Sequence, residues 1–254
     1  MLPLKWVQNS LHDRITSDEL FHFVGHGRPA DHEANFGVLS KVLRTGCISH
    51  PPHDGTAGRI GYTVTWNKHL EDETLIVPTV TCFADIPKNA LSIHISKYGA
   101  FGVALSRSLL VARGARPVTY IPLSSGDWMS LSGRGLLRDI EAIRKGFSIR
   151  VIEPCKECLP KSRTYGKEPS TFEEAIAAVE EILDKEFLPF LKPFNSELSD
   201  CDADNFYMER EWRKYGNMKF RASDVTTVVV AKGYEERLLV EFPEYADRIL
   251  PISI

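Results

Sequence analysis

The hydrophobic and polar positions of the chain follow two periods, one typical of strands and one typical of helices. Glu19–Val24 is aromatic-rich and partly alternating, which predicts a strand. Apolar residues then recur at helical spacing, at Phe36, Leu39, Val42 and Leu43. Asn35 has the side chain of an N-cap, and Gly46 stands where a glycine commonly stops a helix. We therefore predict a helix that begins after Asn35 and ends at Gly46.

The strongest helical period lies in Thr171–Leu191. Its apolar stripe consists of Phe172, Ala175, Ile176, Val179, Ile182, Leu183 and Phe187. Ser170 or Thr171 can cap its first turn, where Glu173 and Glu174 favour the positive end of the helix. We predict one continuous helix over this range.

The remaining elements follow from the same two periods. Strands are predicted at Val77–Phe83, Phe101–Leu105, Pro117–Ile121, Asn205–Lys214, Val225–Ala231 and Ile249–Ile254. Helices are predicted at Pro87–Tyr98, Ser106–Arg113, Asp127–Arg144 and Tyr234–Phe242. Because strands and helices follow one another irregularly, we expect an α+β fold, with a mixed β-sheet core and flanking helices.

We expect a single domain over residues 1–254, with a helical and loop excursion at about 126–201. Within it, Lys156–Pro169 is polar and flanked by prolines, so it is the best candidate for a linker. His50–Gly61 is rich in glycine and proline and is predicted to be a surface loop.

Composition and charge narrow the class of protein. Hydrophobic residues make up 43% of the chain and charged residues 26%, as in ordinary globular proteins. A net charge of −3 excludes a broad basic field, which disfavours a general nucleic-acid-binding protein. Five cysteines, an odd number, indicate a reducing compartment rather than a disulfide framework. Without an apolar run of about 20 residues or a signal-peptide pattern, we expect a cytoplasmic protein without membrane contact.

The sequence carries no P-loop, GxGxxG, HExxH or GxSxG motif. Cys155 and Cys158 have the spacing of half a zinc site, and His50 and His53 flank two prolines. Because a closed zinc site needs four ligands and no second pair follows, we predict no metal site.

Three short stretches carry the candidate chemistry. His22 lies within the first strand, Phe83 and Tyr98 flank a short helix, and Glu209 and Glu211 would share one face of a strand. Each has a plain structural alternative. His22 and Phe83 can be core residues, and the glutamates can belong to a charged edge strand that resists aggregation.

The first-strand histidine, the loop leading to the helix NFGVLSKVLRTG and the CFAD segment resemble ADP-ribosyltransferase-like folds, including the DarT-like enzymes. The resemblance implies that NAD is the cofactor. It would be held by His22, Gly25, Phe83 and Tyr98, with Arg44 or Arg59 on the pyrophosphate. Glu209 or Glu211 would stabilise the oxocarbenium-like transition state, so the catalytic set would be His22, Tyr98, Glu209 and Glu211. Val24 stands where those enzymes commonly carry a hydroxyl, which favours the non-catalytic alternative.

The segments SDELFHFVG, TCFADIP, HISKYGAFGVALSRSLLVARGARPVTYIP and FYMEREWR also resemble the AbiGi family of abortive phage resistance, over residues 17–125 and 204–254. This resemblance implies a role in phage defence. Two hypotheses follow from it. The protein is an enzyme that transfers ADP-ribose from NAD to a protein or nucleic acid, or it is a non-catalytic antitoxin or regulatory component. The second implies a toxin partner, and both allow a phage-derived trigger.

Overall fold

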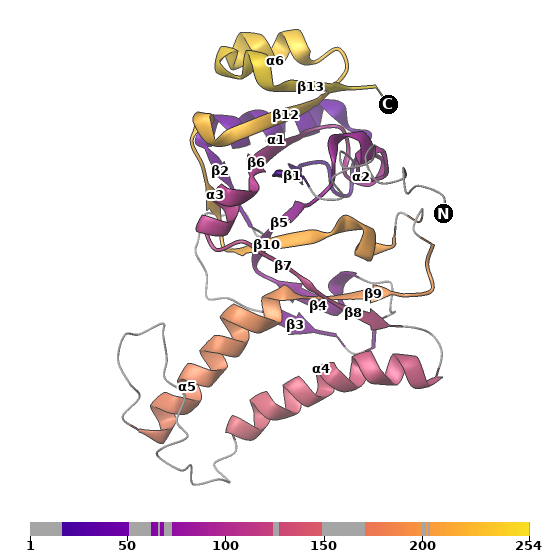
Figure 1. The fold of residues 1–254 in the computed structure, drawn as a ribbon, viewed down its shortest axis with the longest axis vertical. Coiled ribbons are helices and arrows are strands. Elements are labelled where there is room, and N and C mark those ends of the chain that lie inside the picture. The colour runs from indigo at the N-terminus through magenta and orange to yellow at the C-terminus, as the bar shows by residue number, and fades with distance from the viewer. Residues whose placement is uncertain are drawn as a thin grey trace, which may run out of the picture. The chain divides into compact units, whose positions relative to one another are not determined.

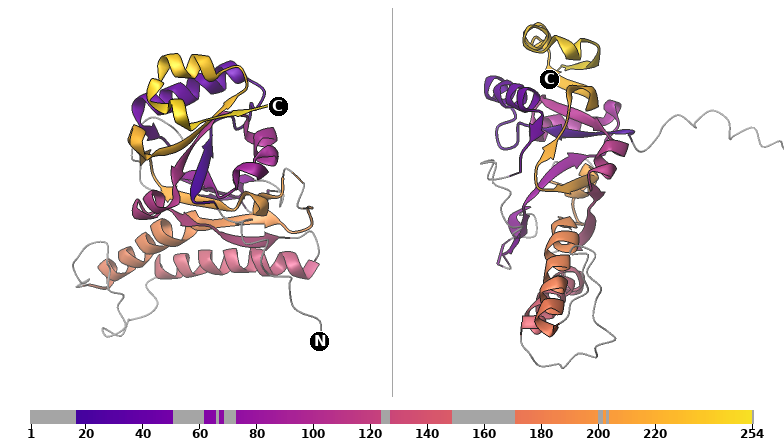
Figure 2. Two further views of the ribbon diagram at one scale, coloured as in Figure 1. Left: turned by 45° about the horizontal axis from the view of Figure 1, so that its top comes forward. Right: turned by 90° about the vertical axis from the view of Figure 1, so that its left-hand side faces the viewer.

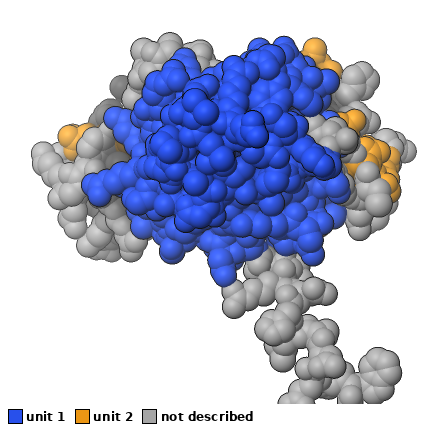
Figure 3. Space-filling model, turned by 90° about the horizontal axis from the view of Figure 1, so that it is seen from above, with its two compact units in different colours: residues 1–49, 81–116, 208–254 blue, residues 50–80, 117–207 orange. Residues whose placement is uncertain are grey.

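The computed structural model describes residues 17–50, 62–65, 67–68, 73–123, 127–148, 171–199, 202 and 204–253. The chain divides into two compact units (Figure 3), and their helices and strands are labelled in Figure 1. Unit 1 combines residues 1–49, 81–116 and 208–254, and unit 2 combines residues 50–80 and 117–207. The expectation of a single domain stays a prediction. The linker candidate Lys156–Pro169 and nearly all of the loop His50–Gly61 lie outside the described residues.

Unit 1 is built on a seven-stranded mixed sheet of order β13-β12-β6-β1-β5-β10-β7. Its central strand β1 (Glu19–Phe23) runs antiparallel to both β5 and β6, whereas β12 and β13 are parallel. The other strands are β5 (Val80–Ala84), β6 (Gly102–Ser106), β7 (Arg116–Pro117), β10 (Glu211–Tyr215), β12 (Val225–Ala231) and β13 (Ile249–Ile252). A short pair, β2 (Cys47–Ile48) and β11 (Met218–Lys219), stands beside it. This sheet with its flanking helices confirms the expected fold class.

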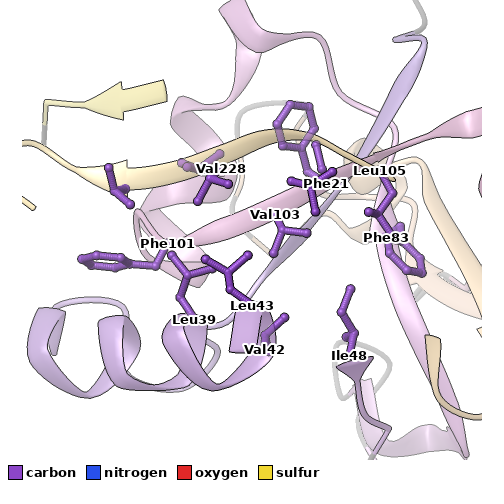
Figure 4. Packing of buried hydrophobic residues seen from close by; sticks show 14 of the residues in the cluster. Phe21, Leu39, Val42, Leu43, Ile48, Phe83, Phe101, Val103, Leu105 and Val228 are labelled. Atoms are coloured by element: carbon purple, nitrogen blue, oxygen red, sulfur yellow. The ribbon is translucent and has the colours of Figure 1, made fainter. Parts of the chain in front are cut away.

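The register of β1 decides which side chains face which layer. His22 lies opposite Val103, and Leu20 lies opposite Leu105, so these four residues share one face of the sheet. Helix α1 (His32–Thr45) covers that face, and its Leu39 and Leu43 point toward Val103, whereas Phe21 points to the opposite side (Figure 4). Phe23 shares the face of Phe21, because side chains alternate along a strand.

Helix α1 begins earlier than its apolar pattern predicts. Asp31 is the N-cap, and its carboxylate accepts a hydrogen bond of 3.1 Å from the backbone N–H of Ala34. The expected cap, Asn35, lies instead in the first turn, where it is fully buried and its amide donates to the carbonyl of Arg28 at 3.0 Å. The expected end is confirmed, since Gly46 has a left-handed φ of 58°.

Three shorter helices complete unit 1: α2 (Ser92–Tyr98), α3 (Arg107–Ala112) and α6 (Glu235–Glu241). Helices α1 and α2 lie on opposite faces of the sheet (Figure 2). Two residues from the start of α6 hold Glu33 of α1. The Tyr234 hydroxyl donates to it at 2.6 Å and the Arg237 guanidinium at 2.7 Å. These contacts fasten α6 to the first turn of α1.

The sheet edge formed by β13 is protected against pairing with a further strand. The N–H of Lys232 donates to the carbonyl of Ile252 at 2.9 Å, so the polar groups of Ile252 face β12. Alternation then turns the backbone of Pro251 toward the open edge. Because proline has no N–H to offer, this edge lacks one of the donors that a new strand would need.

Unit 2 contains two small sheets and two long helices. Strands β3 (Tyr62–Val64) and β4 (Ile76–Pro78) are antiparallel, and β8 (Thr119–Leu123) and β9 (Leu191–Asn195) are parallel. The helices are α4 (Asp127–Ser148) and α5 (Phe172–Ile182). Its core gathers Leu75, Ile76, Ile121, Leu123, Leu137, Ile140, Leu188 and Leu191.

Several expected elements are interrupted, and three of them lie partly or wholly in unit 2. Val77–Phe83 is two strands in different sheets, β4 and β5, and Val77 is 46% exposed. Pro117–Ile121 is divided between β7 and β8. The long helix expected over Thr171–Leu191 stops at Ile182 and continues as a wide π turn and a short 3₁₀ turn before β9. Pro189, which has no N–H, lies in that 3₁₀ turn and prevents a regular continuation.

Candidate functional site

The segment from Phe206 to Tyr215 differs from the uninterrupted strand expected there. Phe206–Glu209 forms a 3₁₀ helix and β10 begins only at Glu211. Between them Arg210 has a φ of +43°, and no other described residue apart from glycine has a positive φ. This left-handed residue turns the chain, so Glu209 and Glu211 do not form the same-face pair that a continuous strand would give.

Glu209 is held by two residues from the end of α2. The Tyr98 hydroxyl donates a short hydrogen bond to its Oε1, and the Lys97 ammonium lies 3.0 Å from the same oxygen. The side chains of Lys97 and Glu209 are only 14% and 9% exposed, so the ion pair is shielded from water. These contacts tie α2 to the segment that leads into β10.

Aromatic rings and a glycine surround Tyr98. The His26 ring lies 5.5 Å from the Tyr98 ring, and the His94 ring lies 6.1 Å from it. A Cβ atom at Gly25 would overlap the carbonyl oxygen of Tyr98, so only glycine allows the loop after β1 to approach this closely. The structure therefore brings together three of the expected site residues, Gly25, Tyr98 and Glu209.

His22 lies elsewhere. Its Nδ1 is 2.8 Å from the carbonyl oxygen of Cys82, and its ring is 5.9 Å from Phe83. It points to the face covered by α1, whereas the neighbouring Phe23 points to the other face, where its ring lies 6.4 Å from His94 of α2. Phe83 is 2% exposed and is part of the core. His22 and Phe83 thus form a pair separate from Tyr98 and Glu209.

The expected phosphate-binding arginines are not gathered around Tyr98. Arg44, in the last turn of α1, pairs with Glu241 at 3.3 Å and lies over the Phe242 ring. Asn35, which also lies on α1, packs between Gly25 and Gly99 next to Tyr98. Arg44 comes nine residues later in the same helix, a rise of about 13 Å along its axis. Arg59 lies outside the described residues.

Glu211 pairs with Arg213 on the same strand. The Arg213 Nε donates to the Glu211 Oε1 at 2.6 Å, and the two side chains are 8% and 6% exposed. Removing one partner of such a pair would leave an uncompensated charge in the interior. Glu211 is thus held by an ion pair within its own strand.

A second cluster, which was not predicted from the sequence, is centred on Asp85 directly after β5. Its carboxylate is buried and receives Arg107 Nη2 at 2.9 Å, Arg210 Nη2 at 3.5 Å and the N–H of Ser17 at 3.0 Å. Arg210 also donates from Nε to the Asp85 carbonyl at 2.9 Å. The sequence does contain one sign of this cluster, since CFADIP places an aspartate at the end of an apolar strand. A carboxylate buried there needs cationic partners, which could have been sought among the arginines.

One family model matches residues 66–237, more than half of the 254 residues, and is described as "Putative abortive phage resistance protein AbiGi, antitoxin". The chain belongs to the AbiGi family. The AbiGi match includes Tyr98, Asp85 and Glu209, whereas His22 precedes it. It also spans residues 126–201, where the sequence showed no resemblance.

Membership confirms the expected family and its link to phage resistance. No curated protein and no solved structure matches the chain significantly. The resemblance to ADP-ribosyltransferases therefore stays a prediction. Of the helices that the structure describes, none is both long enough and apolar enough to cross a bilayer.

Proposed function

We propose that this AbiGi protein is an antitoxin of an abortive-infection system and that it acts by binding its toxin. The family match over residues 66–237 carries this proposal, because the family is described as an antitoxin. An antitoxin needs a toxin partner, and it needs no cofactor if association alone blocks the toxin.

The geometry of unit 1 supports a binding role over a catalytic one. The two expected catalytic glutamates are engaged separately, Glu209 by Lys97 and Tyr98 and Glu211 by Arg213. His22 faces α1, on the other side of the sheet from Phe23 and the ring of His94. The Glu209 contacts join α2 to the segment before β10, and the Glu211 contact lies within β10, so both carboxylates already have partners in the fold.

A growth assay tests the proposal. Cells that express the toxin encoded beside this protein are expected to stop growing, and co-expression of the protein is expected to restore colony formation. Glu209→Gln should still restore growth whenever the variant accumulates to the wild-type level, because the carboxylate has no chemical step to perform. Growth arrest caused by this protein alone, or failure to protect against the toxin, would contradict the proposal.

A second candidate, ADP-ribosyl transfer from NAD to a protein or nucleic acid, rests on the contact between Tyr98 and Glu209 beside Gly25. In that case Tyr98 would stack on the nicotinamide and Glu209 would stabilise the developing positive charge. NAD should then raise the melting temperature by ligand linkage, and Glu209→Gln should abolish phage protection without unfolding the protein. If NAD does not shift the melting temperature and the Glu209→Gln variant still protects cells against phage, the transferase function is excluded and the binding role is retained.

A further inference from the structure

Two arginines from distant parts of the chain converge on Asp85 in unit 1. Arg107 comes from the start of α3, and Arg210 lies between the 3₁₀ helix and β10. Their Nη2 atoms lie 2.9 Å and 3.5 Å from the same carboxylate oxygen. The distance between the two nitrogens therefore cannot exceed the sum of these two values. A single oxyanion can bridge donors separated by this distance.

The charges in this cluster do not balance. Among the residues that the structure describes, two guanidinium groups, which stay protonated at all physiological pH values, face one carboxylate, so a charge of about +1 remains there. The acidic residues nearest in sequence to Arg210 do not compensate it, because Glu209 and Glu211 are held by Lys97 and Arg213. An unbalanced, partly buried cationic pair is a favourable place for a second anion.

The two arginines also retain unused hydrogen-bond donors. The Arg107 Nη2 donates to Ser17 and Asp85, but its buried Nε has no hydrogen-bond partner in the described part of the chain. The Arg210 Nε donates to Asp85, and its buried Nη2 likewise lacks a hydrogen bond there. Each guanidinium has five N–H groups, so several stay available. The two nitrogens without a partner are themselves buried, but the side chains as a whole are 28% and 32% exposed, so a ligand from solvent would meet the other N–H groups of the two guanidiniums.

The backbone of Arg210 and the ring of Trp212 add to this arrangement. Arg210 holds its left-handed φ of +43° at an energetic cost, which residues outside functional or tightly constrained positions rarely bear. The Arg107 guanidinium lies 5.8 Å from the centre of the Trp212 ring, and this contact fixes the direction of its fork. The result is a pair of arginines held in place before any ligand arrives.

We infer that Arg107 and Arg210 form a binding site for one phosphoryl group of a small molecule such as a nucleotide. Arginine forks match phosphate oxygens in pairs, and a dianion would more than neutralise the remaining charge. A single phosphoryl group fits better than a polynucleotide, because the net charge of −3 provides no wider basic field for successive phosphates. The inference does not depend on the antitoxin assignment.

Titration of the full-length protein with inorganic phosphate, at constant ionic strength, tests the site. We expect saturable binding, followed by calorimetry up to ~10 mM phosphate, since so small a ligand should have a dissociation constant of about 1 mM. Arg107→Gln and Arg210→Gln should each weaken binding by about tenfold or more. Each single variant leaves Asp85 with the other arginine, so folding should be retained. Arg237→Gln is the matched control, since Arg237 also pairs with a glutamate and stacks on rings but lies on α6.

Asp85→Asn provides a change of opposite sign. It removes the carboxylate that competes for the same donors, so phosphate should bind several-fold more tightly than to the wild type. ADP and a single-stranded DNA oligonucleotide distinguish the source of the phosphoryl group. ADP should compete with phosphate, whereas tight oligonucleotide binding with a steep salt dependence would overturn the small-molecule assignment. Absence of phosphate binding to the wild type, or binding by both arginine variants that is as tight as that of the wild type, would overturn the site itself.

Discussion

At Gly25 the loop after β1 passes so close to the backbone of Tyr98 that no side chain fits between them. Asn35 occupies the neighbouring space, and its amide donates to the carbonyl of Arg28. At the scale of single residues, this close approach places Tyr98 where its hydroxyl reaches Glu209. Single substitutions in this region are therefore expected to change the free energy of unfolding measurably.

Gly25→Ala should destabilise the protein by about 2 kcal/mol, because the new methyl group collides with backbone atoms that cannot rotate away. Gly37→Ala is the matched control on the exposed face of α1, where a methyl group meets nothing within 4 Å. It should stabilise the helix by about 0.5–1 kcal/mol. Urea denaturation measures both changes, and a similar effect of the two substitutions would contradict the close packing at Gly25.

Glu209→Gln should lower the free energy of unfolding by about 1–3 kcal/mol, because it removes the negative charge that faces the shielded Lys97 ammonium. The amide can still accept the hydrogen bond from Tyr98. Glu33→Gln breaks a pair on the surface and should cost less, since water screens that pair. Comparing the two urea midpoints checks this order. An unchanged midpoint for Glu209→Gln would show that the ion pair does not stabilise the fold.

At the scale of elements, the sequence predicted correctly those strands and helix ends that depend mainly on residues close together in the chain. The strand at β1, the end of α1 at Gly46, and β12 are close to their expected limits. Elements that depend on distant contacts were missed. Asn35 and Asp31 are both good caps, and only the burial of Asn35 between two glycines decides between them. The turn at Arg210 could not be predicted, because arginine has no preference for a positive φ.

The candidate site was predicted only in part, because it also depends on contacts between residues that are distant in the sequence. Tyr98 and Glu209 were singled out from motifs, and the structure joins them. His22 was placed with them because of the resemblance to ADP-ribosyltransferase-like folds, in which a first-strand histidine holds NAD, yet the face on which a strand residue points depends on its register. The cluster of Asp85, Arg107 and Arg210 joins residues up to 125 positions apart, which no local pattern can reveal.

The contact between α1 and α6 should depend on pH at both extremes. The hydrogen bond from Tyr234, followed by that from Arg237, holds the pKa of the Glu33 carboxyl below its ordinary value. The same bond with Glu33 holds the pKa of the Tyr234 phenol above its ordinary value. Stability from Glu33 is present above the ordinary carboxyl pKa and is lost as the pH falls through the lowered value. Stability from Tyr234 is present below the ordinary phenol pKa and is lost as the pH rises through the raised value.

Hydrogen exchange measures this dependence. The amides of Leu238 and Phe242 in and after α6 should lose protection at low and at high pH, relative to those of β6. Glu33→Gln should remove the acid response while leaving β6 unchanged. Equal protection of α6 across the whole range would contradict the role of Glu33 and Tyr234 as the fastening of α6.

At the scale of the whole molecule, the AbiGi match extends over parts of both compact units, from residue 66 to residue 237. Each unit has its own apolar core, with that of unit 2 packed between α4 and its small sheets.

Calorimetric titration of the purified protein with its purified toxin, in the absence of NAD, tests the central claim most directly. We predict saturable binding by the wild-type protein. The Glu209→Gln variant, confirmed as folded by its melting curve, should bind with the same affinity. Absence of binding, or binding and neutralisation that require NAD and the Glu209 carboxylate, would contradict an antitoxin that acts by association.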